Sequence, residues 1–201
     1  YEHMVIDEVQ DLSVIEVKLL IGCVGSEDKQ AGAEPSLTMA GDVAQRLIFD
    51  NGFSNFVELL PAVGLRNVHI QRLNIMYRST AEVMSLAHEV LGPLLTDESR
   101  QVATRHGAPS AAFAFTEVGE AVAFLGESLR SLLQREPTAS VALVARHAGT
   151  ATLYYQGLQK AEVPSLRRVA RHEFTFAPGV DVTDVLQVKG LEFDYVVILD
   201  A

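Results

Sequence analysis

The chain has 201 residues, of which 48% are hydrophobic and 21% charged, and its formal net charge at pH 7 is −10. This length suits one or two small domains, and no apolar run approaches the roughly 18 residues needed to cross a membrane. The acidic balance excludes a protein that coats nucleic acid by electrostatic attraction alone. The single cysteine, Cys23, excludes a disulfide within the chain and suits a reducing cytoplasm; we expect it in the core.

Hydrophobic periodicity predicts strands that alternate with helices along the whole chain. The predicted strands cover residues 3–6, 36–40, 68–70, 111–115, 141–144, 181–186 and 195–199, and the predicted helices cover 12–24, 53–60, 79–91, 119–134 and 148–161. Ser79 and Glu82 have the spacing of a capping box at the start of one helix. This alternation predicts an α/β fold with a mostly parallel sheet.

Two acids, Asp7 and Glu8, directly follow the first predicted strand, with Gln10 and Asp11 close behind. Phosphates bind at the carboxyl edge of such a sheet, where a first acid can hold Mg²⁺ and a second can activate water. The other half of an ATP site is a loop of the form G-x-x-x-x-G-K-[ST], and no segment of the chain matches it. An ordinary strand end with two solvated acids is the alternative.

Three further clusters carry polar residues of the same kind. Gly41-Asp42 with Gln45 follows a predicted strand, Arg78 lies just ahead of a predicted helix, and Lys189–Asp194 leads into the last strand. A Gln amide can bind both a phosphate and a water, and the planar fork of an Arg suits phosphate. The basic residues Arg167, Arg168, Arg171 and His172 are typical of a solvated loop or strand edge more often than of a binding patch.

Taken together, these segments resemble motifs II, III, IV and V of superfamily 1 helicases of the UvrD/Rep type, in order and approximate spacing. The resemblance implies two RecA-like domains that enclose ATP. Residues 1–72 would be the rear of the first domain. Residues 73–201 would be most of the second, without its large accessory insertion.

The resemblance also implies residue roles. Asp7 would bind Mg²⁺ and Glu8 would activate the attacking water, while Gln10 and Gln45 would sense the γ-phosphate of ATP. Arg78 would be an arginine finger. Glu192 would contact the nucleotide ribose, and Gly190 would shape that turn.

The positions that contact DNA in this family differ here. Ile48 and Asn51 stand where the pattern has an aromatic residue and an Arg, and Asp184 and Leu186 stand where it has Thr and His. This combination resembles the HelD branch, whose members act on RNA polymerase.

Three hypotheses follow from the sequence. The first is part of a cytoplasmic DNA helicase or translocase that uses ATP and Mg²⁺ on single-stranded or partly duplex DNA. The second is a HelD-like ATPase with RNA polymerase as partner, and the third is an interaction module without nucleotide chemistry. None involves a membrane. We expect the chain to be a fragment that is inactive alone.

Overall fold

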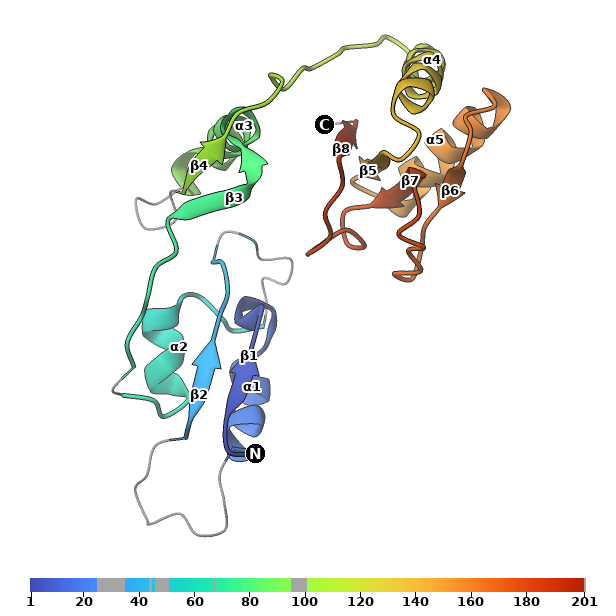
Figure 1. Ribbon diagram of the computed structural model, residues 1–201. Helices are drawn as coiled ribbons and strands as arrows, with labels where there is room; N and C mark the ends of the chain where they lie inside the picture. The colour runs from blue at the N-terminus through green and yellow to red at the C-terminus, as the bar shows by residue number, and fades with distance from the viewer. Residues whose placement is uncertain (25–34, 44, 46–50, 67, 95–100, 201) are drawn as a thin grey trace. The chain divides into compact units, whose positions relative to one another are not determined.

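The computed structural model describes residues 1–24, 35–43, 45, 51–66, 68–94 and 101–200. The chain forms two compact units, Tyr1–Ala111 and Ala112–Ala201. Figure 1 traces both units from the blue N-terminus to the red C-terminus. Within the described ranges, no helix combines the length and the apolar character that crossing a membrane requires.

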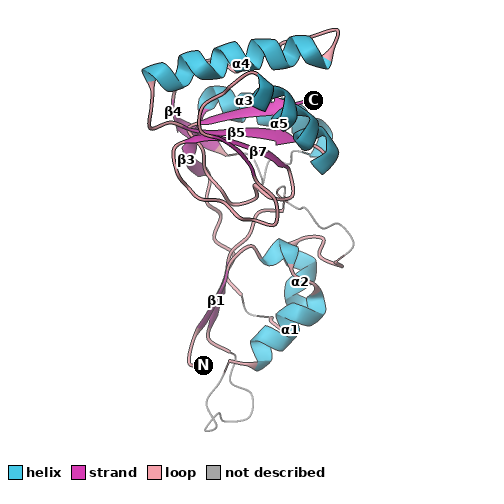
Figure 2. Ribbon diagram, turned by 90° about the vertical axis from the view of Figure 1, so that its right-hand side faces the viewer, coloured by secondary structure: helices cyan, strands magenta, loops and turns pink. Residues whose placement is uncertain are grey.

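The first unit begins with two short parallel strands, β1 (Met4–Ile6) and β2 (Leu37–Met39), in which Met4 pairs with Leu37. The helices α1 (Val14–Gly22) and α2 (Phe56–Ala62) lie on the same side of β1 (Figure 2). Side chains alternate along a strand, so Ile6 is buried in the core while Val5 is 67% exposed. The buried core residues of this part are Ile6, Val9, Val17, Phe53, Leu59, Leu60, Val63 and Leu65.

Local sequence signals start and stop these two helices. The Ser13 hydroxyl accepts from the Glu16 backbone N–H at 3.2 Å, and the Ser13 N–H donates to the Glu16 carboxylate at 2.7 Å. This capping box contributes about 1 kcal/mol. At the end of α2, Gly64 has φ +87°, and the Leu65 N–H donates to the Leu60 carbonyl at 2.9 Å, which is a Schellman ending.

The expectation that Cys23 is a core residue is wrong. Cys23 is exposed and is the C-cap of α1. The apolar residues of α1 extend around the helix: Leu19 is 67% exposed, and Val17 is the residue that α1 buries.

A strand–helix–strand element follows within the first unit. Strand β3 (Ile75–Thr80) leads into α3 (Ala81–Leu91), a short 3-10 turn η2 (Gly92–Leu94), and β4 (Val102–Arg105), which pairs parallel with β3. The prediction of a strand at 68–70 is wrong, because these residues form no strand. The strand of this region is β3, a few residues later, where the chain can pair with β4.

The predicted capping box of Ser79 and Glu82 is also wrong. The N-cap is Thr80, whose hydroxyl accepts from the Val83 N–H at 3.4 Å. The Glu82 carboxylate instead accepts from the Gly107 N–H at 2.9 Å and contacts His106 Nδ1 at 3.0 Å. It therefore anchors the chain that leaves β4.

The second unit is an α/β layer with a four-stranded, fully parallel sheet in the order β6-β7-β5-β8. Its elements are α4 (Val118–Arg135), β5 (Ser140–Ala145), α5 (Ala148–Lys160), β6 (Leu166–Arg168), β7 (Gly179–Asp184) and β8 (Tyr195–Leu199). The sequence predicted α4, α5, β5, β7 and β8 in nearly these positions. It missed β3, β4 and β6, and the strand predicted at 111–115 is not formed.

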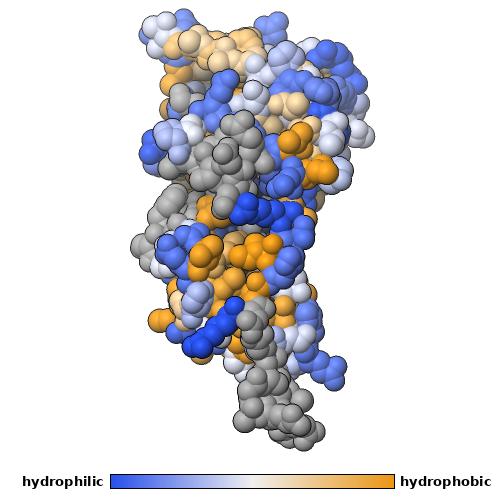
Figure 3. Space-filling view, turned by 90° about the vertical axis from the view of Figure 1, so that its left-hand side faces the viewer, coloured by the Kyte–Doolittle hydropathy of each residue, from blue (hydrophilic) through white to orange (hydrophobic). Residues whose placement is uncertain are grey.

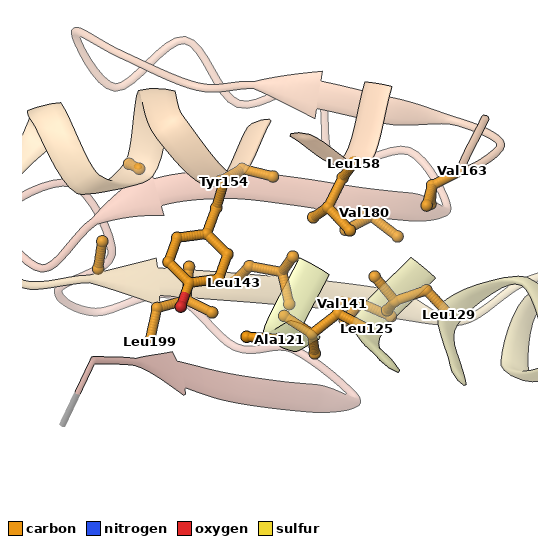
Figure 4. Packing of buried hydrophobic residues seen from close by; sticks show 13 residues of the cluster. Ala121, Leu125, Leu129, Val141, Leu143, Tyr154, Leu158, Val163, Val180 and Leu199 are labelled. Carbon is orange, nitrogen blue, oxygen red and sulfur yellow. The ribbon is translucent and has the colours of Figure 1, made fainter. Parts of the chain in front are cut away.

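Helices α4 and α5 bury apolar side chains against β5, β7 and β8 (Figure 4). Leu143 and Leu158 are 0% exposed and Leu129 is 3% exposed. Each such side chain contributes roughly 1.5–3 kcal/mol when it leaves water. The helices approach closely because of Gly157, where a Cβ would lie 2.9 Å from both methyl carbons of Val122.

Candidate functional site

The two acids of the first motif lie where β1 ends. Both Asp7 and Glu8 are exposed. Glu8 adopts a left-handed backbone conformation, with φ 51° and ψ 39°, and its N–H donates to Asp7 Oδ1 at 2.9 Å. This conformation is uncommon for a residue with a side chain. It turns the chain sharply from β1 into the short helix η1 (Val9–Asp11).

Gln10 is fully buried directly behind Glu8, with 0% of its surface exposed. Its Nε2 donates to Glu8 Oε2 at 2.5 Å, and its Oε1 accepts from the Asp42 backbone N–H at 3.1 Å. Both ends of the amide are therefore bonded within the protein. The expectation that Gln10 senses a phosphate gains no support from this burial, since the side chain links Glu8 to the loop after β2.

Gly41 fits this arrangement by close approach. A Cβ on Gly41 would lie 2.3 Å from Gln10 Oε1 and 3.1 Å from Val9 Cγ1. Real Cβ atoms do not tolerate the first distance. The absence of a side chain at Gly41 thus lets the loop after β2 approach Gln10 closely.

Gln45 continues the same hydrogen-bonded series. It is exposed, and its Nε2 donates to Asp42 Oδ2 at 2.9 Å. A hydrogen-bonded series thus runs from Glu8 to Gln45. The Gln10 side chain joins Glu8 to the backbone of Asp42, and the Asp42 carboxylate joins the series to Gln45. Of the predicted site residues, the structure brings Asp7, Glu8, Gln10 and Gln45 together.

Arg78 occupies a separate element. It is an exposed residue of β3 and lies two residues ahead of the N-cap of α3, as the sequence predicted. Its strand pairs with β4, in a sheet distinct from that of β1 and β2.

The segment 189–194 belongs to the second unit and combines a turn with a structural anchor. Gly190 has φ +76°, with open space where a Cβ would stand, so the backbone conformation is what favours glycine there. Glu192 is exposed.

Asp194 has a structural role that the sequence analysis missed. Its Oδ2 accepts from both the N–H and the hydroxyl of Ser140 at 2.8 Å, which joins the starts of β5 and β8. These bonds hold the pKa of Asp194 below its ordinary value. The sequence signal that could have indicated this role is Ser140, a small hydroxyl residue at the start of the apolar strand.

The basic residues Arg167 and Arg168 serve the fold. Arg167 pairs with Asp181, and Arg168 donates to the carbonyls of Val182, at 3.1 Å, and of Ala148, at 3.3 Å. Both residues belong to β6, the edge strand of the sheet, so the expected strand-edge position is confirmed for these two residues.

The four positions that differ from the DNA-contact pattern of the helicase family do not share one environment. Ile48 lies outside the described residues. Asn51 donates to the backbone carbonyl of Gln10, Asp184 is 7% exposed, and Leu186 is 60% exposed. Asn51 is a residue whose structural role sequence reasoning did not identify.

The acids at the end of β1 fit a magnesium ion in the way that nucleotide sites use it. Across the described ranges, no three or more His, Cys, Asp or Glu side chains form a metal cage. Mg²⁺ in such sites takes one or two carboxylates and completes its shell with water and phosphate oxygens. Asp7, an exposed carboxylate at a strand exit, suits this role.

The fold and this polar edge define an α/β protein with parallel sheets and flanking helices. No family model matches the chain. It is 26% identical over 169 residues to the ATP-dependent DNA helicase UvrD2 of Mycobacterium bovis and to that of Mycobacterium tuberculosis. The match covers 81% of this chain and 23% of each relative, so the chain spans about a quarter of their length. The chain is thus distantly similar to UvrD-type helicases.

Proposed function

We propose that the chain is part of an ATP-hydrolysing motor of the UvrD/Rep helicase type, with ATP hydrolysis coupled to movement on single-stranded DNA. The observation that carries the proposal is the hydrogen-bonded series from Glu8 through Gln10 and Asp42 to Gln45. The series links the two segments that resemble motifs II and III, at the carboxyl ends of two adjacent parallel strands. Ligands bind at this edge in open α/β sheets.

The residues at this edge suit a division of labour. Asp7 would hold Mg²⁺, which when bound neutralises charge on the phosphates. Glu8 would accept a proton from the attacking water, which requires a carboxylate within hydrogen-bond reach of that water. Gln45, exposed and bonded to Asp42, would contact the γ-phosphate.

Residues of later segments would complete the ATP site in the parent protein. Arg78 would supply positive charge to the transition state, a role worth roughly 10³–10⁵ in rate in phosphoryl transfer. Glu192 would contact the ribose, with Gly190 forming the turn. We propose a division of the chain at 72/73 into parts of two RecA-like domains, and a cytoplasmic location.

The 201-residue chain alone is expected not to hydrolyse ATP, because its sequence carries no phosphate-binding loop. Micromolar binding of ATP by the isolated chain would contradict this. The test of the catalytic assignment is Glu8→Gln in the longer protein that carries the chain. We expect turnover to fall by about 10²–10⁴, the usual contribution of a general base. Unchanged turnover would leave the interaction module as the better hypothesis.

A HelD-like ATPase is the second candidate, and the observation that favours it is Asn51. Where the DNA-contact pattern has an Arg, Asn51 uses its amide for internal hydrogen bonds. Stimulation of the ATPase by single-stranded DNA decides between the candidates. Strong stimulation supports the translocase. Its absence, together with binding to purified RNA polymerase, supports the HelD-like reading.

A further inference from the structure

Asn51, a few residues ahead of α2, is hydrogen-bonded to the segment that contains the short helix η1. Its Nδ2 donates to the Gln10 carbonyl at 2.8 Å and to the Leu12 carbonyl at 3.3 Å. Its Oδ1 accepts from the Phe53 N–H at 3.0 Å. Phe53 is 2% exposed in the core of the first unit, so Asn51 is anchored to a fixed point. The backbone of Gln10 is therefore held from outside its own segment.

The Gln10 side chain passes this restraint on to Glu8. Because Oε1 accepts from the Asp42 N–H, the amide must present its NH₂ group toward Glu8. An exposed glutamate otherwise samples several rotamers, and ordering it costs entropy. A donor on a fully buried side chain removes part of that freedom. One carboxylate oxygen of Glu8 is thereby fixed in position.

We propose that Asn51 and Gln10 are positioning residues that hold the Glu8 carboxylate in the geometry needed to accept a proton from water. This inference rests on the proposed function, in which Glu8 is the general base. Proton transfer requires a heavy-atom separation of about 2.6–3.2 Å, and a misplacement of about 1 Å can cost 10²-fold in rate. Asn51 thus acts on the reaction through Gln10 and Glu8.

The substitution Asn51→Asp in the longer ATP-hydrolysing protein isolates this effect. Aspartate keeps the oxygen that accepts from Phe53 and loses the donor to the Gln10 and Leu12 carbonyls. We expect kcat for ATP hydrolysis to fall about tenfold or more, while KM for ATP changes less than about twofold, because the substrate contacts remain. The matched control is Asn55→Asp, at the N-cap of α2, where Asn55 Oδ1 accepts from the Glu58 N–H at 2.9 Å. Its kcat should equal that of the unmodified protein.

A second variant keeps the test decisive if Asn51→Asp does not fold. Gln10→Met retains a long buried side chain and removes the donor to Glu8, so it should lower kcat by a similar factor with KM unchanged. If Glu8→Gln abolishes turnover but a folded Asn51→Asp or Gln10→Met enzyme keeps full kcat, the positioning role is wrong and the proposed function stands. If Glu8→Gln itself keeps full turnover, Glu8 is not the base, and both the catalytic assignment and the positioning role fail.

Discussion

Arg167 Nε donates to Asp181 Oδ1 at 2.6 Å, and these two residues are direct neighbours across β6 and β7. Asp181 is 4% exposed, on the opposite face of the sheet from Val180 and Val182, which belong to the core under α4 and α5. Arg167 also donates to the carbonyls of Ala177 and Pro178, so the same guanidinium fixes the loop that leads into β7.

Removing one partner of this pair should destabilise the second unit strongly. Asp181→Ala leaves a partly buried guanidinium without its carboxylate, and the expected loss is about 3–5 kcal/mol of unfolding free energy. Urea unfolding followed by circular dichroism measures it. Arg171→Ala, at an exposed position in the same loop, is the control and should change stability by less than about 0.5 kcal/mol. Equal stabilities of the two variants would show that the pair contributes little.

The close approach of Gly41 to Gln10 predicts a second effect on stability. Gly41→Ala places a methyl carbon only 2.3 Å from Gln10 Oε1. Overpacking of this kind costs about 1–3 kcal/mol of unfolding free energy. Thermal unfolding of the 201-residue chain measures the loss.

Two further variants separate this clash from a general effect of replacing glycine. Gly22→Ala lies in the last turn of α1 with nothing within 4 Å of the new Cβ, and it should be neutral or stabilising. The double variant Gly41→Ala with Gln10→Ala should lose less than the sum of the two single variants, because truncating Gln10 removes the clash. Strict additivity would argue against the contact.

The sequence was sufficient for elements whose apolar pattern is strong. The run Val141–Val144 predicts a buried strand by itself, and β5 is the central strand with β7 and β8 on either side. Strand β6 was missed because two of its three residues are arginines. Arg167 pairs with Asp181, and Arg168 donates to the carbonyls of Val182 and Ala148, partners that lie 14 and 20 residues away in the chain. A local pattern does not contain such tertiary pairing.

For the candidate site, the polar clusters are visible in the sequence, but the contacts within them are not. Glu8 and Gln10 meet because Glu8 is left-handed, a conformation that its residue type does not favour. The Glu8–Gln10 contact, the Asn51 bond to Gln10 and the anchoring of Asp194 by Ser140 were therefore beyond periodicity and motif spacing.

The Glu82 carboxylate predicts a dependence of stability on pH. The Gly107 N–H, followed by the His106 side chain, lowers the pKa of Glu82 to about 2 from 4.5. A carboxyl group with a lowered pKa in the folded state contributes stability that is fully present above its unfolded pKa and is lost as pH falls through the folded value. The contribution of Glu82 should therefore be complete above about pH 4.5 and disappear toward pH 2.

The pKa values of Asp194 and Glu16 are also lowered, so these two residues add to the same pH dependence of stability. Comparison with Glu82→Gln isolates the contribution of Glu82. The melting temperature of the unmodified chain should exceed that of Glu82→Gln at neutral pH, and the difference should shrink as pH falls from 4.5 to 2. A difference that stays constant over this interval would contradict the role of ionised Glu82.

The proposed division at 72/73 predicts where the chain is cut by protease. Residues 68–74, between α2 and β3, are exposed and form neither helix nor strand. α3 has no buried residue, and β3 and β4 expose Ile75, Tyr77 and Val102; apolar residues are also visible on the surface in Figure 3. The exposed segment 68–74 is therefore the expected place of the first cut.

Limited trypsin digestion distinguishes the proposed boundary from one at the division between the compact units. Early cleavage after Arg72, with a persistent product that begins at Leu73, is the expected result, because proteases cut exposed irregular segments first. Early cleavage after Arg105 instead, leaving a stable product that begins at His106, would place the boundary near Ala111 and contradict the proposal. Replacing Arg72 with Gln should delay the first cut, which ties the cut to that bond.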